Sequence, residues 1–193
     1  MIHLIHGIHT QGASPVQGLI PYLRTAGFDV RYPDYGWIAG VETRIANPII
    51  CGSLRPYIAP DDIVIGHSNG CAIIYDMLRG GLKVAGAAFI NAALEQSIQP
   101  LAPWIDVFFN LGDEITEAAK IGAAIGVTDS AWGEMGHAGY SGSDPSIRNY
   151  NCGATSGMPV VWGHSDFFTP ANLTYWAPFL IDRISSHTAR AAA

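Results

Sequence analysis

The sequence predicts an α/β protein with one domain over residues 1–193, built on a central, mostly parallel sheet of about six strands with helices on both faces. Short apolar runs alternate along the chain with helix-like segments, which is the order of βαβ units. Most of these runs are continuously apolar, as expected of strands buried on both faces. The length of 193 residues, with 49% hydrophobic and 13% charged residues, suffices for a sizeable core.

The first predicted unit is a strand, a helix and a second strand. Two apolar runs, residues 1–7 and 27–33, end at a glycine and a proline. Residues 14–27 between them predict a helix, with Ser14 as N-cap and Pro15 at the first helical position. This order is that of a βαβ unit.

The rest of the chain continues the alternation. Residues 38–58 predict a second helix, broken at Pro48. The elements expected after it are a strand at 61–66, a buried helix at 69–81, strands at 84–94 and 104–112, a helix at 113–125, a last strand at 159–163 and an amphipathic helix at 170–187. Residues 126–158 carry no periodic pattern and are predicted to be a long loop.

Charge and hydropathy narrow the range of partners. Ten Lys and Arg against 16 Asp and Glu give a net charge of −6, without a basic run, which argues against nucleic acid or an anionic membrane as partner. A small, mostly neutral ligand is expected instead. The chain opens without a signal-peptide pattern, and no apolar stretch approaches the ~20 residues of a membrane span. Taken as a whole chain, the sequence predicts a cytoplasmic protein.

The three cysteines argue against a disulfide framework and against a zinc site. Cys51, Cys71 and Cys152 are odd in number and have no Cys-x-x-Cys spacing. The sequence remains compatible with a single disulfide bridge. Cys71 is read as a small buried apolar residue.

The pattern Gly-x-Ser-x-Gly at residues 66–70 raises the question of a catalytic serine. In a chain with 22 glycines the pattern alone is weak evidence. Its position is more informative, because Ser68 follows a predicted strand and precedes a buried helix, as a nucleophile elbow requires. We therefore expect Ser68 to be a nucleophile. His67 beside it is expected to pack against its neighbours, not to act as the base.

An acid and a histidine follow two later predicted strands. Asp113 comes after the strand at 104–112, and His164 comes after the strand at 159–163. The carboxyl ends of parallel strands form the binding edge of such sheets, so we expect a catalytic triad in the order Ser68, Asp113, His164. The competing candidates for the acid are Glu114, Asp106 and Asp166, and the competing base is His137.

The loop after the first strand is expected to form an oxyanion hole. It is rich in glycine, and the backbone N–H of Ile8 is predicted to act together with that of Asn69. Three histidines, His3, His6 and His9, surround this loop; we interpret them as its structural support and not as a metal cluster.

Four short motifs together resemble the α/β-hydrolase superfamily, through nearly the whole chain. They are "HG" at 6–7, "GHSNG" at 66–70, "LGDE" at 111–114 and "GHSDFF" at 163–168, in the family's order. The resemblance implies a serine hydrolase of the compact esterase, lipase or cutinase type that cleaves carboxylic esters through an acyl-enzyme, with no cofactor, no metal and no large cap domain. Thioesterase or amidase activity would use the same triad, and a non-catalytic binding protein of the same fold is the alternative of another class.

The segment 126–158 is expected to act on substrate choice. It lies between the acid and the histidine, and Trp132, Met135 and Tyr140 are the apolar side chains predicted to form a pocket wall or partial lid. The competing interpretation is a solvated insertion.

Overall fold

A computed structural model describes residues 1–8, 13–36, 42–118, 132–155 and 157–191. Its centre is a sheet of six strands in the order β2-β1-β3-β4-β5-β6, and every neighbouring pair is parallel. The strands are β1 (Ile2–Ile5), β2 (Val30–Arg31), β3 (Ile63–His67), β4 (Gly86–Ile90), β5 (Ile105–Phe109) and β6 (Ile147–Asn151). The predicted fold class is confirmed.

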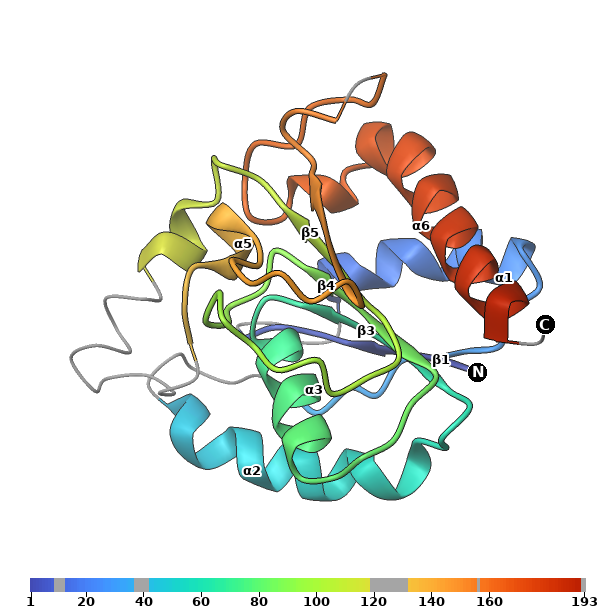
Figure 1. The fold of residues 1–193 in the computed structure, drawn as a ribbon, viewed down its shortest axis with the longest axis vertical. Coiled ribbons are helices and arrows are strands. Elements are labelled where there is room, and N and C mark those ends of the chain that lie inside the picture. The colour runs from blue at the N-terminus through green and yellow to red at the C-terminus, as the bar shows by residue number, and fades with distance from the viewer. Residues whose placement is uncertain (9–12, 37–41, 119–131, 156, 192–193) are drawn as a thin grey trace.

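Helices cover both faces of the sheet (Figure 1). On one face lie α1 (Ile20–Thr25) and α6 (Pro170–Ala191), and on the other lie α2 (Thr43–Leu54) and α3 (Asn69–Arg79). Successive strand residues alternate between two apolar layers: Ile65 packs on the α6 side and Val64 on the α3 side. Each such fully buried side chain stabilises the fold by roughly 1.5–3 kcal/mol.

The described parts of the first two predicted helices form, with one correction. The short 3₁₀ helix η1 (Pro15–Leu19) leads into α1, and the N–H of its N-cap Ser14 donates to Oε1 of Gln17. The second predicted helix corresponds to α2, which continues through Pro48, so the predicted break is wrong. A proline removes one helical hydrogen bond, and α2 offsets this loss by burying one face, which consists of Thr43, Asn47, Ile50 and Leu54.

The last strand is the largest departure from the prediction. Residues 159–163 are not in the sheet; the sixth strand is β6, which pairs with β5 from Ile147 to Asn151. β6 lies at the sheet edge and has exposed residues along its middle, so its sequence lacks the continuous apolar run that marks a buried strand. The apolar residues at 159–163 instead alternate: Val161 is buried and Trp162 is 63% exposed.

The segment 126–158 also contains a helix, α5 (Met135–Ala138), so the prediction of a long loop is wrong for its described part. Residues 126–131 lie outside the described residues. α5 is too short to show periodicity and is anchored by tertiary bonds: the N–H of Met135 donates to the carbonyl of Leu94, and that of Gly136 to Ala92. Within the predicted helix 113–125, residues 114–118 are helical and the others from 119 on are not described.

The amino-terminal half of β5 contributes a buried ion pair far along the strand from the predicted site. Asp106 is buried, and its Oδ2 lies 3.3 Å from Nε of Arg183 and 3.3 Å from Nε2 of His187, both on α6. This cluster ties α6 to the sheet. In the part of the chain that the structure describes, no helix is long and apolar enough to cross a membrane.

Candidate active site

Ser68 occupies a turn of unusual backbone geometry between β3 and α3. Its φ is 57° and its ψ is −127°, a conformation that costs a non-glycine residue about 1–3 kcal/mol. Strain of this kind persists where the surrounding structure enforces it, and it concentrates at functional sites. The N–H of Ser68 donates to the carbonyl of Ile90, and its carbonyl accepts from the N–H of Cys71 and of Ala93.

Close backbone packing around this turn explains its glycines. A Cβ on Gly66 would lie 2.8 Å from the backbone nitrogen of Cys71, and a Cβ on Gly70 would lie 2.6 Å from the carbonyl oxygen of His6. The loop after β1 also passes directly beside the serine: a Cβ on Gly7 would lie 3.3 Å from Oγ of Ser68. The start of α3 and the end of β1 therefore meet only because these positions lack side chains.

Gly70→Ala should therefore destabilise the protein by about 3 kcal/mol or more, because its methyl group meets fixed carbonyls of β1 and the following loop. Gly52→Ala is the matched control: Gly52 lies in α2 with nothing within 4 Å of its Cβ position, and alanine there should stabilise by about 0.5–1 kcal/mol. Midpoints of thermal unfolding measure both. Equal effects of the two substitutions would contradict the close packing.

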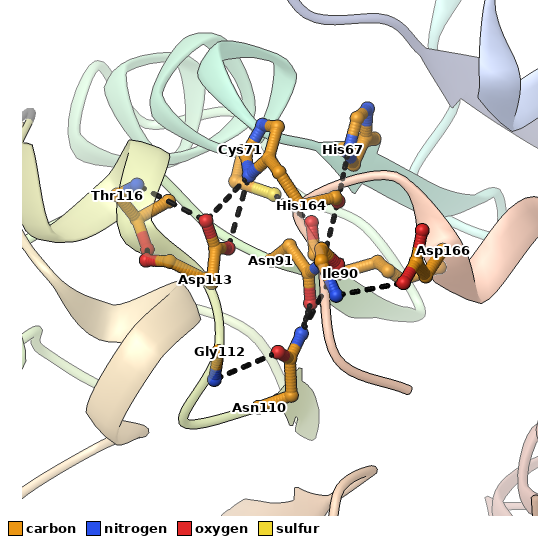
Figure 2. Close-up of polar contacts among 11 residues, drawn as sticks. His67, Cys71, Ile90, Asn91, Asn110, Gly112, Asp113, Thr116, His164 and Asp166 are labelled. Atoms are coloured by element: carbon orange, nitrogen blue, oxygen red, sulfur yellow. Dashed lines mark hydrogen bonds and ion pairs between the residues drawn. The ribbon is translucent and has the colours of Figure 1, made fainter. Parts of the chain in front are cut away.

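The structure brings His164 and Asp113 into contact (Figure 2). Nδ1 of His164 lies 2.9 Å from both Oδ1 and Oδ2 of Asp113. Asp113 is fully buried, and its Oδ1 also accepts the N–H of Thr116 in the helical turn that it begins. A proton on Nδ1 donated to this carboxylate leaves Nε2 of the ring as the acceptor, which is the form that a general base needs.

The competing acids do not pair with His164. Asp106 pairs with α6, Glu114 is exposed, and Oδ2 of Asp166 accepts the N–H of Gly163. Among the described residues, Asp113 alone of these four forms an ion pair with His164. The competing base, His137, lies on α5 and forms no ion pair with a described carboxylate.

The backbone of the His164 loop is held by side chains that the sequence analysis did not single out. Nδ2 of Asn91 donates to the carbonyl of His164 at 2.6 Å and lies 3.3 Å from that of Gly163, and Nδ2 of Asn110 lies 3.4 Å from the Gly163 carbonyl (Figure 2). Asn91 follows β4 directly and Asn110 follows β5 directly. The repeated ending, two apolar residues and then asparagine, was a signal that could have identified both.

His67 supports the same loop from the other side. Its Nε2 lies 3.1 Å from the carbonyl of His164, so Nε2–H is the donor, and its ring packs edge-on against Phe168. Burial, reinforced by the nearby His164, lowers the pKa of His67 from 6.5 to about 3. His67 is therefore neutral near pH 7 and has the packing role expected from the sequence.

Asn91→Gly should lower the kcat of a reaction that uses His164 as the base by about tenfold with little change in KM, because the His164 carbonyl loses its 2.6 Å donor and the imidazole is held less firmly. Glycine tolerates the positive φ of 47° at this position, so backbone strain does not confound the result. Asn172→Ala, which removes an exposed amide donor to the Asp166 carbonyl, is the control and should be neutral. An equal loss of kcat in the two variants would contradict the role of Asn91 in holding the His164 loop.

The predicted oxyanion loop is supported by aromatic stacking. The ring of His6 stacks on Tyr35 with centroids 3.7 Å apart, its Nδ1 lies 2.8 Å from the Gly7 carbonyl, and the Tyr35 hydroxyl donates to the His6 carbonyl. Ile8 is half-buried against the α3-side core. His6 therefore supports the loop, as expected.

The other two histidines of the predicted trio differ from His6. Nε2 of His3 lies 2.9 Å from Oδ2 of Asp62, the residue directly before β3, so His3 supports the start of the strands and not the loop. His9 lies outside the described residues. Within the described ranges, no three His, Cys, Asp or Glu side chains are placed to hold a metal ion. All three cysteines are free, so the single bridge left open does not form.

The three predicted pocket residues differ in exposure. Met135 is fully buried in the core, Trp132 is 7% exposed, and Tyr140 is half-buried against the same core. Nε1 of Trp132 donates to the side chain of Asn69 at 2.8 Å. Their contact with substrate stays a prediction, and for Trp132 the structure adds a partner that the sequence did not suggest.

Comparison with known proteins identifies the fold. No protein-family model matches the chain, and no curated protein matches its sequence. Solved structures do match. Mouse alpha/beta hydrolase domain-containing protein 10 has a TM-score of 0.65 and 11% identity, over 96% of this chain and 89% of that one.

Two further solved structures have the same fold. The Paleococcus ferrophilus monoacylglycerol lipase has a TM-score of 0.56 and 15% identity, over 96% of this chain and 94% of that one. A Pyrococcus furiosus esterase has a TM-score of 0.55 and 10% identity, over 98% and 82%. At such identities the likeness establishes the shared architecture alone. The chain has the α/β-hydrolase fold.

Proposed function

We propose that this protein is a serine hydrolase that cleaves carboxylic esters with Ser68 as nucleophile, His164 as general base and Asp113 as the acid that orients it. The observation that carries the proposal is the contact of His164 Nδ1 with both oxygens of the buried Asp113. The His164 ring centroid lies 4.8 Å from that of His67, the residue before the strained turn of Ser68. The names of the structural neighbours, among them an esterase and a lipase, support a hydrolase.

The proposed reaction has two acyl-transfer steps. His164 Nε2 takes the hydroxyl proton as Ser68 Oγ attacks the ester carbonyl, and Asp113 stabilises the imidazolium that forms. The backbone N–H groups of Ile8 and Asn69 hold the oxyanion, with the start of α3 directed at the developing charge. The proton then passes from His164 to the leaving alcohol, and water repeats the attack on the acyl-enzyme.

The short distance between the two oxyanion segments supports this role. Ser68 Oγ lies against Gly7, one residue before Ile8, while Asn69 is the first residue of α3. Both proposed donors therefore belong to segments that adjoin Ser68, which supports their acting together on a carbonyl that Ser68 attacks.

A fluorophosphonate probe tests the proposal. We expect it to label the wild-type protein at Ser68 and to leave the Ser68→Ala variant unlabelled, with p-nitrophenyl acetate turned over by the wild type alone. Thioester and amide substrates, compared at equal concentration, separate the related activities that use the same triad. A folded wild type that is neither labelled nor active would overturn the proposal in favour of a binding protein. Labelling at another serine would show that Ser68 is not the nucleophile.

A further inference from the structure

We infer that Trp132 and Asn47 are positioning residues for the oxyanion hole, acting through the side chain of Asn69. The inference rests on the proposed function, in which the N–H of Asn69 is one of the two oxyanion donors. It gives Trp132 a role in the chemical step, distinct from the pocket wall that the sequence suggested.

Three hydrogen bonds converge on the Asn69 side chain. Its Oδ1 accepts Nδ2 of Asn47 at 3.0 Å and Nε1 of Trp132 at 2.8 Å, and its own Nδ2 donates to Oδ1 of Asn47 at 2.9 Å. Asn47 and Asn69 are fully buried, and Trp132 is 7% exposed. Buried, satisfied polar networks of this kind fix one geometry, because breaking a single bond leaves an unpaired group in a medium of low dielectric.

The three partners come from different parts of the chain. Asn47 lies on α2, Asn69 is the first residue of α3, and Trp132 precedes α5. The indole donor reaches Asn69 across 63 residues of sequence. The bonds join α2 and the chain before α5 to α3, and all three act on the side chain of the residue that follows Ser68.

The position of Asn69 makes that orientation consequential. The peptide that joins Ser68 to Asn69 carries the proposed oxyanion donor, and Ser68 itself has strained backbone angles. A side chain held at three points resists rotation of this peptide. Oxyanion donors are effective when they are fixed before charge develops, and removal of one donor costs about 10²–10³ in kcat. Loosening a donor that remains present should cost less.

Trp132→Phe removes the indole N–H and keeps an aromatic ring in the core. For p-nitrophenyl acetate we expect kcat to fall about tenfold with KM within about twofold, and the affinity for an alkylboronic acid, which forms a tetrahedral adduct with the serine, to fall by a similar factor. The short acyl group keeps pocket contacts out of the measurement. Tyr75→Phe is the matched control, because it removes a buried hydroxyl that accepts the Gln99 N–H at 2.8 Å, also from a residue on α3. It should leave kcat unchanged.

Asn47→Ala provides a second route to the same network if Trp132→Phe does not fold. Each variant should lower kcat, and the double variant should lower it by less than the product of the two, because both act through Asn69. A folded Trp132→Phe or Asn47→Ala with wild-type kcat overturns the inference, as does a loss confined to KM or an equal loss in Tyr75→Phe. If the fluorophosphonate probe labels wild-type Ser68, the proposed function holds and these outcomes test the positioning role alone. An unlabelled, inactive wild type would overturn both the proposed function and the positioning role.

Discussion

Ser68→Ala and His164→Ala are each expected to lower kcat for p-nitrophenyl acetate by roughly 10⁴-fold or more while the fold stays intact. The alanine in place of Ser68 removes the nucleophile, and the alanine in place of His164 removes the group that takes its proton. Nucleophile and base act as a unit, so the double variant should be about as slow as either single one. Steady-state kinetics measure kcat, and circular dichroism measures whether each variant is folded.

The two variants also test the choice of histidine. His137→Ala is the control, because His137 lies on α5 and has no ion pair with a described carboxylate. It should retain most of the activity. An active His164→Ala together with an inactive His137→Ala would transfer the base to His137.

Asp113→Asn is expected to lower kcat by about 10³- to 10⁴-fold in a folded protein. Both carboxylate oxygens lie 2.9 Å from Nδ1 of His164, and an amide that presents its NH₂ group to the ring stabilises the tautomer with the proton on Nε2. That tautomer cannot accept the proton of Ser68.

Two matched carboxylates near the site complete this test. Asp166→Asn removes the negative charge of the side chain that accepts the Gly163 N–H, and Glu114→Gln removes that of the exposed neighbour of Asp113. Both should stay within about threefold of the wild type. A nearly normal Asp113→Asn beside an inactive Asp166→Asn or Glu114→Gln would reassign the acid.

The strands that are buried on both faces are predictable from sequence. The residues of β1, β3, β4 and β5 are nearly all buried and form continuous apolar runs, and Ser68 and Asp113 could be placed at strand ends because the strands before them were recognised. His164 was also placed at a predicted strand end, although residues 159–163 before it do not pair in the sheet. Its position depends instead on donors that come from elsewhere in the chain, above all Asn91.

Elements that depend on long-range contacts could not be predicted from the sequence. β6 is polar because its middle residues are exposed, and α5 is a single helical turn held by bonds to the chain after β4. The bond between Trp132 and Asn69 joins residues whose separation and types follow no local pattern. Local propensity cannot report such contacts, because it describes a residue's neighbours in sequence and not its partners in space.

The polar character of β6 has a consequence for how copies of this protein meet. Unpaired strand edges are templates for aggregation unless they are short, charged or covered. β2 offers only the two residues Val30–Arg31, and β6 presents Arg148 and Asn149 at its exposed middle. The amide of Asn149 also bonds both the N–H and the carbonyl of Tyr140, which ties the chain after α5 to this strand. Neither edge of the sheet, in the part of the chain that the structure describes, therefore offers a second copy a long apolar strand with which to pair.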